Sequence, residues 1–148
     1  MVVNIKVKKL NVNAKLPSRG SAQAAGYDLY ACLDSETFVI KPHETVKIGT
    51  GLCIEVPEGY FGGIFARSGI ATNKGLRPAN CVGVADSDYR GEYMVTLHND
   101  SDFVQTITQN ERIVQLVIMP FLPVVFEEVN ELSETKRGDG GFGSSGLK

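Results

Sequence analysis

The chain is poor in cysteine, with only Cys32, Cys53 and Cys81 among its 148 residues. These three are far apart, odd in number and without a Cys-x-x-Cys pair, which argues against both a disulfide framework and a zinc site. We therefore expect them to be small buried hydrophobic residues of a protein in a reducing compartment.

The sequence also lacks an excess of positive charge and long apolar runs. Its net charge is −2 and 22% of its residues are charged, so nothing indicates the dense basic stripe that nonspecific nucleic-acid binding requires. No continuous apolar run approaches the ~20 residues of a membrane span, and no signal peptide is evident. We expect a cytoplasmic protein with neither a nucleic-acid nor a membrane partner.

Familiar catalytic arrangements are missing as well. No Gly-Lys-Ser/Thr follows the glycines of the tail, which excludes a P-loop, and Gly138-x-Gly140-x-x-Gly143 has neither the strand before it nor the helix after it that a dinucleotide fingerprint needs. The two histidines, His43 and His98, are expected to be structural. No Ser or Cys has a recognisable His partner, so nucleophilic hydrolysis is unsupported.

The chain does contain many short apolar segments with a period of two, such as Leu52/Ile54/Val56 and Val95/Leu97, and denser runs at residues 113–119 and 124–129. Turn residues recur between them every eight to twelve positions. This pattern predicts an all-β domain, a distorted β-barrel or jelly-roll-like fold. One short helix is predicted over residues 68–73, closed by Gly75.

The composition changes near the C-terminus. Five glycines fall between Gly138 and Gly146 with only one phenylalanine among them, so this segment is too poor in apolar residues to pack by itself. We divide the chain into a catalytic domain, residues 1–132, and a flexible lid segment, residues 133–148.

Two segments of the predicted body carry groups suited to phosphate. Arg67, Ser68 and Gly69 put a cation, a hydroxyl and backbone amides at the predicted helix start. Gln115 lies in an apolar run, where it either closes a structural hydrogen bond or faces a ligand. Arg112 is interpreted as structural.

Residues 80–92 (Asn-Cys-Val-Gly-Val-Ala-Asp-Ser-Asp-Tyr-Arg-Gly-Glu) form the most specific segment. It is interpreted as a β-hairpin whose tip offers alternating backbone N–H and C=O groups to the edge of uracil, with Gly83 in the strand and Asn80 adding an amide. Cytosine would set a donor against a donor there, which is costly when buried. The sequence alone does not choose between Asp86 and Asp88 as a catalytic carboxylate.

Five segments together resemble the trimeric dUTPase family over nearly the whole chain. They are residues 25–31 (Ala-Gly-Tyr-Asp-Leu-Tyr-Ala), 66–69 (Ala-Arg-Ser-Gly), 80–92, 112–115 (Arg-Ile-Val-Gln) and 137–146. The resemblance implies a homotrimer that hydrolyses dUTP to dUMP and pyrophosphate by water attack at the α-phosphorus. It also implies active sites shared between subunits. Such an enzyme keeps uracil out of DNA and supplies dUMP.

The resemblance also assigns roles to residues. Asp86 is implied as the catalytic base, Tyr89 as the ring that excludes a 2′-hydroxyl, and Asp28 as a carboxylate near the metal and its waters. Implied contacts to the phosphate chain or the uracil come from Arg67, Ser68, Gly69, Gln115, Arg137, Phe142, Gly143, Ser144 and Ser145. Three phosphates carry about four negative charges, so Mg2+ is expected to ride on them and their waters without direct protein ligands.

Two alternatives stay open. A binding or regulatory protein would hold dUTP without turnover, although Asp86 argues against this. A dCTP deaminase relative would need a glutamate near Arg67, and residues 67–72 contain none. The sequence departs from the family pattern at Ala85, where a larger aliphatic residue is common, and at Phe65-Ala66, where a proline is common.

Overall fold

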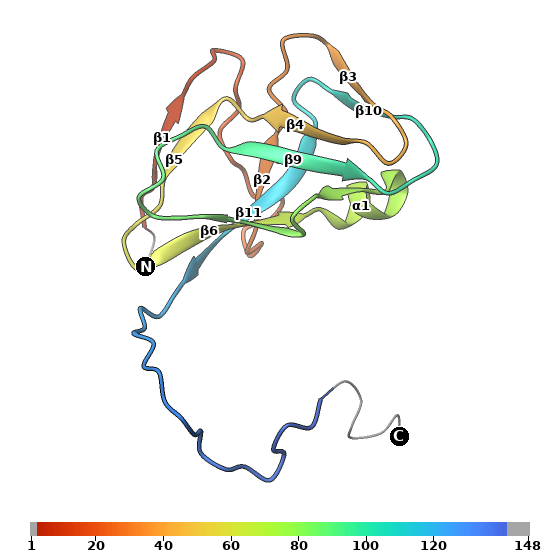
Figure 1. The fold of residues 1–148 in the computed structure, drawn as a ribbon. Coiled ribbons are helices and arrows are strands. Elements are labelled where there is room, and N and C mark those ends of the chain that lie inside the picture. Colours follow the sequence, from red (N-terminus) through yellow and green to blue (C-terminus); the bar gives the residue numbers. More distant parts are fainter. Residues whose placement is uncertain (1–2, 142–148) are drawn as a thin grey trace.

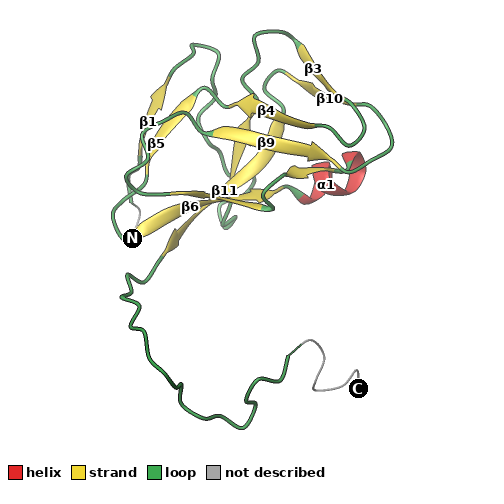
Figure 2. Cartoon of the chain, viewed as in Figure 1, coloured by secondary structure: helices red, strands yellow, loops and turns green. Residues whose placement is uncertain are grey.

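The computed structural model describes residues 3–141, which form an all-β body with one short helix and a long C-terminal arm (Figures 1 and 2). The prediction of an all-β class with one short helix is confirmed. The elements are β1 Lys6–Lys9, β2 Tyr27–Tyr30, β3 Thr37–Ile40, β4 Thr45–Gly49, β5 Leu52–Glu55, β6 Tyr60–Ala66, α1 Ser68–Lys74, β7 Leu76–Pro78, β8 Val82–Ala85, β9 Met94–Asn99, β10 Gln105–Thr108 and β11 Arg112–Pro120.

Within the described part of the chain, the strands form four small antiparallel sheets instead of one closed barrel. The largest sheet has the order β2-β11-β6-β8, a second has the order β4-β9-β7, and β1-β5 and β10-β3 are two-stranded. Because every sheet contributes to one hydrophobic cluster, the arrangement stays close to the predicted barrel-like architecture.

Alternation of side chains builds this core. Leu52 and Ile54 on β5 are buried, as are Val95 and Leu97 on β9, with less buried residues between them. Successive side chains of a strand point to opposite faces, so the period of two in the sequence becomes one buried and one outer face.

The helix α1 occupies the predicted place and extends one residue further, to Lys74. It ends at Gly75, whose left-handed φ of 66° costs little without a Cβ and whose N–H donates to the Ala71 and Ile70 carbonyls. Lys74 Nζ donates to Glu111 Oε1 at 2.6 Å and to the Thr106 carbonyl at 2.8 Å, which fixes the helix end against the start of β11. No helix within residues 3–141 is long and apolar enough to span a membrane.

The predicted hairpin over residues 80–92 is wrong. Among the described strands, its first flank, β8, pairs only with β6, whereas the following strand, β9, pairs with β4 and β7 in a different sheet. The tight turn itself is present, since the Tyr89 N–H donates to the Asp86 carbonyl at 3.1 Å. After the turn, the Tyr93 N–H donates to the Leu52 carbonyl, so the chain crosses toward β5 and cannot fold back on β8.

Two further expectations differ from the structure. Residues 124–129 form no strand: the last strand ends at Pro120, and residues 121–141 leave the body as an exposed arm (Figure 1). Val125 and Phe126 are 96% and 94% exposed, and within the part of the chain that the structure describes no strand pairs with them. The three cysteines are free thiols and none is fully buried as expected, since Cys32 and Cys53 are half-buried and Cys81 is exposed.

Candidate active site

Three neighbouring strands bring Asp28, Arg67 and Arg112 together. On β2, Asp28 lies opposite Gln115 of β11, and β11 in turn pairs with the end of β6, beside Arg67. The Arg67 Nε donates to Asp28 Oδ1 at 2.7 Å, and Arg112 Nη1 donates to Asp28 Oδ2 at 3.2 Å. The Asp28 side chain is only 13% exposed. We call these three residues the arginine cluster.

This geometry makes Asp28 an organiser of cations. Both of its oxygens accept from arginines, and a charge-assisted pair of this kind fixes the orientation of a guanidinium. Arg67 also donates through Nη1 to the Arg112 carbonyl at 3.3 Å. The arginine cluster therefore presents two oriented positive groups beside the start of α1.

The helix start supplies further groups of the same kind. Arg67 is the N-cap residue with extended backbone, and no side chain caps the first turn. Ser68 and Gly69 are exposed, and a Cβ at Gly69 would meet only open space. A surface pocket of about 290 Å³ adjoins them; it is lined by Arg67, Gly69, Ile70, Asn73, Lys74, Glu111 and Arg112.

Gln115 holds the backbone behind this pocket. Its Nε2 donates to the Ala66 carbonyl at 2.9 Å, next to Arg67. Its amide also lies so close to Gly26 that a Cβ there would collide with it. The hydrogen bond to Ala66 corresponds to the structural role, one of the two expected for Gln115. Through it, the Gln115 side chain connects the segments that contain Gly26 and Arg67.

Asp86 lies elsewhere, at the end of β8. It is exposed, as is Asp88 two residues later, and the structure does not distinguish between them by burial. Both border a surface pocket of about 640 Å³, which is lined by Glu55, Val56, Pro57, Glu58, Asp86, Ser87, Asp88, Arg90 and Phe121. We call the segment from Asp86 to Tyr89 the aspartate turn.

The alternating backbone N–H and C=O groups that were expected at a hairpin tip lie instead along the edge of β8. β8 is the edge strand of its sheet, so one side of its backbone has no neighbouring strand from residues 3–141 of the same chain. Gly83 lies within β8, and the Asn80 amide nitrogen lies 3.6 Å from where a Gly83 Cβ would stand. An open strand edge presents N–H and C=O groups in the same alternating order as a hairpin tip.

The arginine cluster and the aspartate turn lie at opposite ends of the β6–β8 pair. Gly62 is paired with Ala85, next to Asp86, whereas Phe65 is paired with Val82, and Arg67 stands five positions beyond Gly62. Asp86 follows Ala85, so it lies about six strand positions from Arg67, which is roughly 20 Å along the sheet at about 3.3 Å per residue. One chain therefore does not bring them to the same phosphate group.

The tail residues are found apart from both groups. Arg137 is exposed on the arm, and its Nε donates to the Gly140 carbonyl at 2.8 Å. Phe142, Gly143, Ser144 and Ser145 lie outside the described residues.

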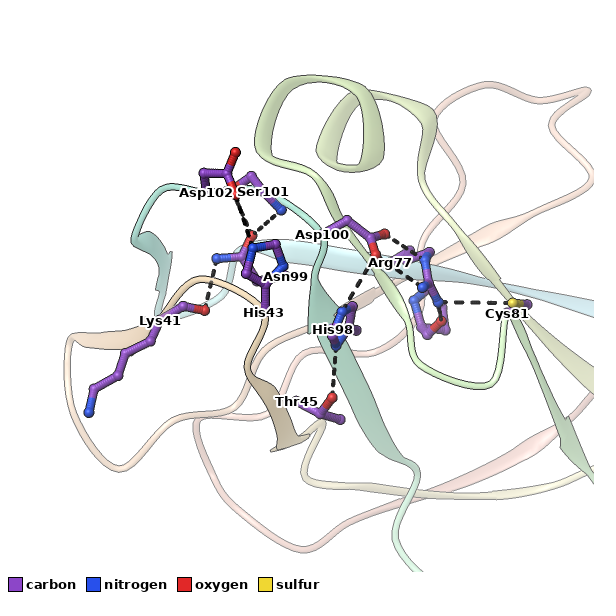
Figure 3. Close-up of polar contacts among 11 residues, drawn as sticks. Lys41, His43, Thr45, Arg77, Cys81, His98, Asn99, Asp100, Ser101 and Asp102 are labelled. Atoms are coloured by element: carbon purple, nitrogen blue, oxygen red, sulfur yellow. Dashed lines mark hydrogen bonds and ion pairs between the residues drawn. The ribbon is translucent and has the colours of Figure 1, made fainter.

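Figure 3 shows where the two histidines lie. The His98 Nδ1 is 2.8 Å from the Thr45 hydroxyl, and its Nε2 is 3.5 Å from Asp100, which Arg77 binds through two nitrogens. His43 Nε2 is 3.0 Å from Asp102. These partners belong to the β4-β9-β7 sheet and its adjoining loops, and they include no member of the arginine cluster or the aspartate turn. The structural interpretation of both histidines agrees with these contacts.

Arg112 and Gly26 also belong to the site region. Arg112, which is expected to be structural, donates to Asp28, and its place in the same Arg-Ile-Val-Gln segment as Gln115 is the signal for it in the sequence. No pattern in the sequence indicates that Gly26 must make room for Gln115, because Gly26, just before β2, and Gln115, on β11, are far apart in the chain.

Comparisons with known proteins identify the family. The dUTPase family model matches residues 12–146. The chain is 49% identical to the deoxyuridine 5'-triphosphate nucleotidohydrolase of Hydrogenobaculum sp. over 96% of this chain and 97% of that protein, and 45% identical to that of Syntrophotalea carbinolica over 98% of both. A structure of the Staphylococcus bacteriophage 80alpha dUTPase with dUPNHPP has a TM-score of 0.89 at 31% identity, covering 99% of this chain and all of that one. The chain belongs to the dUTPase family.

Proposed function

We propose that this chain hydrolyses dUTP to dUMP and pyrophosphate, with water attacking the α-phosphorus. The observation that carries this proposal is the similarity, over nearly the full length, to curated nucleotidohydrolases of deoxyuridine 5'-triphosphate. The names of those relatives state the substrate and the reaction that we propose for this chain. The roles of individual residues are our inference.

Asp86 acts as the general base in this proposal. It orients and deprotonates the attacking water and accepts a hydrogen bond from the sugar 3′-hydroxyl. Its exposure in the single chain fits this role, since a base must reach a water that enters with the substrate. The pocket beside it has room for such a ligand.

The arginine cluster binds the phosphate chain together with Ser68 and Gly69. Arg67 and Arg112 supply positive charge, and Asp28 is a positioning residue that orients both guanidinium groups. Gln115 keeps the Ala66 backbone in place behind them. This assigns Asp28 a different role from the expected contact with a metal's waters.

Backbone N–H and C=O groups on the open edge of β8 form hydrogen bonds with the uracil, with Gly83 and Asn80 nearest to the base. The ring of Tyr89 lies beneath the deoxyribose and leaves no space for a 2′-hydroxyl. Because Tyr89 is 45% exposed and stands three residues after Asp86, one turn serves both the sugar and the chemistry.

Mg2+ completes the proposed site. Among residues 3–141, no group of three or more His, Cys, Asp or Glu side chains is arranged to hold a metal ion. We expect the substrate phosphates to carry the metal, with carboxylates binding its waters. When bound, Mg2+ neutralises phosphate charge and polarises the α-phosphoryl group.

A homotrimer with shared sites would explain how the arginine cluster and the aspartate turn, which are far apart in one chain, act on the same substrate. The aspartate turn of one subunit would face the arginine cluster of another, and both would then reach the same triphosphate. The exposed apolar side chains of the arm support association, because Val125, Phe126 and Leu132 are more than 85% exposed in the single chain. Arg137, Phe142, Gly143, Ser144 and Ser145 would close over the site from a neighbouring subunit.

Pyrophosphate release measured with dUTP, dTTP, dCTP and UTP tests the reaction. We expect release from dUTP and little from the other three. Ammonia release from dCTP, or tight dUTP binding without single turnover, would contradict the proposal in favour of a deaminase or a regulatory binder, respectively.

Mixed oligomers test the sharing of sites. Asp86→Asn and Arg67→Gln each remove one half of the site, so each homo-oligomer should be nearly inactive. Refolded together in equal amounts, they should recover roughly a quarter of the wild-type activity. At each shared site, the subunit that supplies Asp86 keeps this residue in about half of the cases, and the same holds for the subunit that supplies Arg67. No recovery in mixtures that chromatography shows to be mixed oligomers would place both halves in one subunit.

A further inference from the structure

Tyr93 is a buried aromatic residue that lies behind Tyr89. Only 2% of Tyr93 is exposed, whereas 45% of Tyr89 is. The two ring centroids are 6.0 Å apart, with an angle of 44° between the ring planes. This separation lies within the range of about 4.5–7 Å at which aromatic rings interact.

The Tyr93 hydroxyl occupies an unusual place. It has no hydrogen-bond partner among the described residues, although it is fully buried. Burial, and to a lesser degree the nearby Tyr89 and Asp86, raises the pKa of Tyr93 to about 12, so the hydroxyl stays neutral. A buried hydroxyl without a partner costs stability.

Two small residues make room for this ring. A Cβ on Gly62 would stand 3.4 Å from the Tyr93 hydroxyl and 3.4 Å from the Ala85 Cβ, and Gly62 is paired with Ala85 in the β6–β8 ladder. In this chain, the end of the Tyr93 ring therefore reaches the space beside Ala85, directly before Asp86.

Tyr89 is held from its other sides as well. Its hydroxyl donates to the Glu92 carbonyl at 2.9 Å. A Cβ on Gly91 would collide with the Tyr89 ring, so the ring lies directly on the Gly91 backbone. With Gly91 and Tyr93 behind it, one side of the Tyr89 ring stays exposed and the ring cannot swing into the body.

We propose that Tyr93 is a positioning residue for sugar selection: its ring supports the Tyr89 ring from inside the body and keeps it where it meets a 2′-hydroxyl. This rests on the proposed function, in which Tyr89 excludes ribonucleotides. The role belongs to the ring of Tyr93, not to its hydroxyl. Tyr93 itself does not touch the substrate.

The test compares selectivity, defined as kcat/KM for dUTP divided by kcat/KM for UTP. Tyr93→Leu removes the ring, and we expect selectivity to fall roughly 2- to 10-fold, the range expected for loss of an aromatic pair. Tyr93→Phe keeps the ring and is the matched control, with selectivity unchanged. Should Tyr93→Leu fold poorly, Ala85→Val with Tyr93→Leu refills the space without an aromatic ring, and the same loss is expected.

A double-mutant cycle separates support of Tyr89 from a general effect on the site. In a Tyr89→Ala background, Tyr93→Leu should change selectivity no further, because the supported ring is already gone. Equal losses in Tyr93→Phe and Tyr93→Leu, unchanged selectivity in Tyr93→Leu, or additive losses in the cycle would each overturn the proposal. If Tyr89→Ala alone leaves UTP rejected, the sugar-selecting role of Tyr89 fails, and this inference fails with it.

Discussion

Asp86 and Asp88 are two exposed carboxylates of one turn, separated by a single serine. If Asp86 is the general base, Asp86→Asn keeps the shape of the turn and removes the proton acceptor. We expect kcat to fall by about 10²–10⁴ while dUTP binding stays within about tenfold. Steady-state kinetics with Asp88→Asn as the matched control decide the matter. An active Asp86→Asn enzyme with an inactive Asp88→Asn enzyme would exchange the two assignments.

Asp28 poses a second question at the scale of one residue, because a role beside the metal and a role beside the arginines predict different responses. Asp28→Asn leaves Arg67 and Arg112 without their shared carboxylate, so we expect KM for dUTP to rise roughly tenfold and stability to fall by about 1–3 kcal/mol. Excess Mg2+ should not restore KM. A titration of Mg2+ that returns the variant to wild-type kinetics would instead support the contact with the metal's waters.

At the scale of elements, the pair between Lys74 and Glu111 joins the end of α1 to the turn before β11. Burial raises the pKa of Glu111, but hydrogen bonds from Lys74 and Thr108 outweigh this and hold the pKa below its ordinary value of 4.5. A lowered folded-state pKa contributes stability that is present above the unfolded pKa and is lost as the pH falls through the folded value.

Glu111→Gln should therefore destabilise the protein by about 1 kcal/mol at pH 7, and the difference from wild type should shrink as the pH falls below 4.5. Urea unfolding at pH 7 and at a pH below 4.5 measures the difference in free energy of unfolding between the variant and the wild type. Glu55→Gln is the control: its partner Lys6 is 82% exposed, and an exposed pair contributes little. A constant difference across the pH range would mean that the Glu111 carboxylate charge is not the source of the stability.

At the scale of the whole molecule, the arm beyond Pro120 leaves the body, and the body keeps its core without it. Deleting residues 137–148 should preserve the fold and the oligomer, since the described part of this segment contributes no buried residue. Activity should fall by about 10²-fold or more because Arg137 and the closing segment are lost. Circular dichroism, light scattering and pyrophosphate release report the three properties. A truncated enzyme with full activity would refute the lid hypothesis.

A ligand experiment complements the truncation at the same scale. In the intact protein, dUPNHPP with Mg2+ should slow proteolytic cleavage within residues 133–148 if this segment closes over the substrate. Equal cleavage rates with and without the ligand would leave the segment as a plain terminus.

The sequence by itself determined what depends on near neighbours along the chain. The period of two placed Leu52, Ile54, Val95 and Leu97 in the core, and Gly75 ended the helix, because side-chain alternation and a left-handed glycine are local properties. The five family segments could also be recognised in the sequence, since each is a short run of specific residues.

Only the tertiary structure decided which distant strands meet. It paired β8 with β6 and not with β9, gave Asp28 two arginine partners, and set Asp86 roughly 20 Å from the arginine cluster along the sheet. It also fitted Tyr93 over Gly62 and beside Ala85. These outcomes depend on contacts between residues far apart in the chain, where burial and hydrogen bonding across the whole fold override local turn preference.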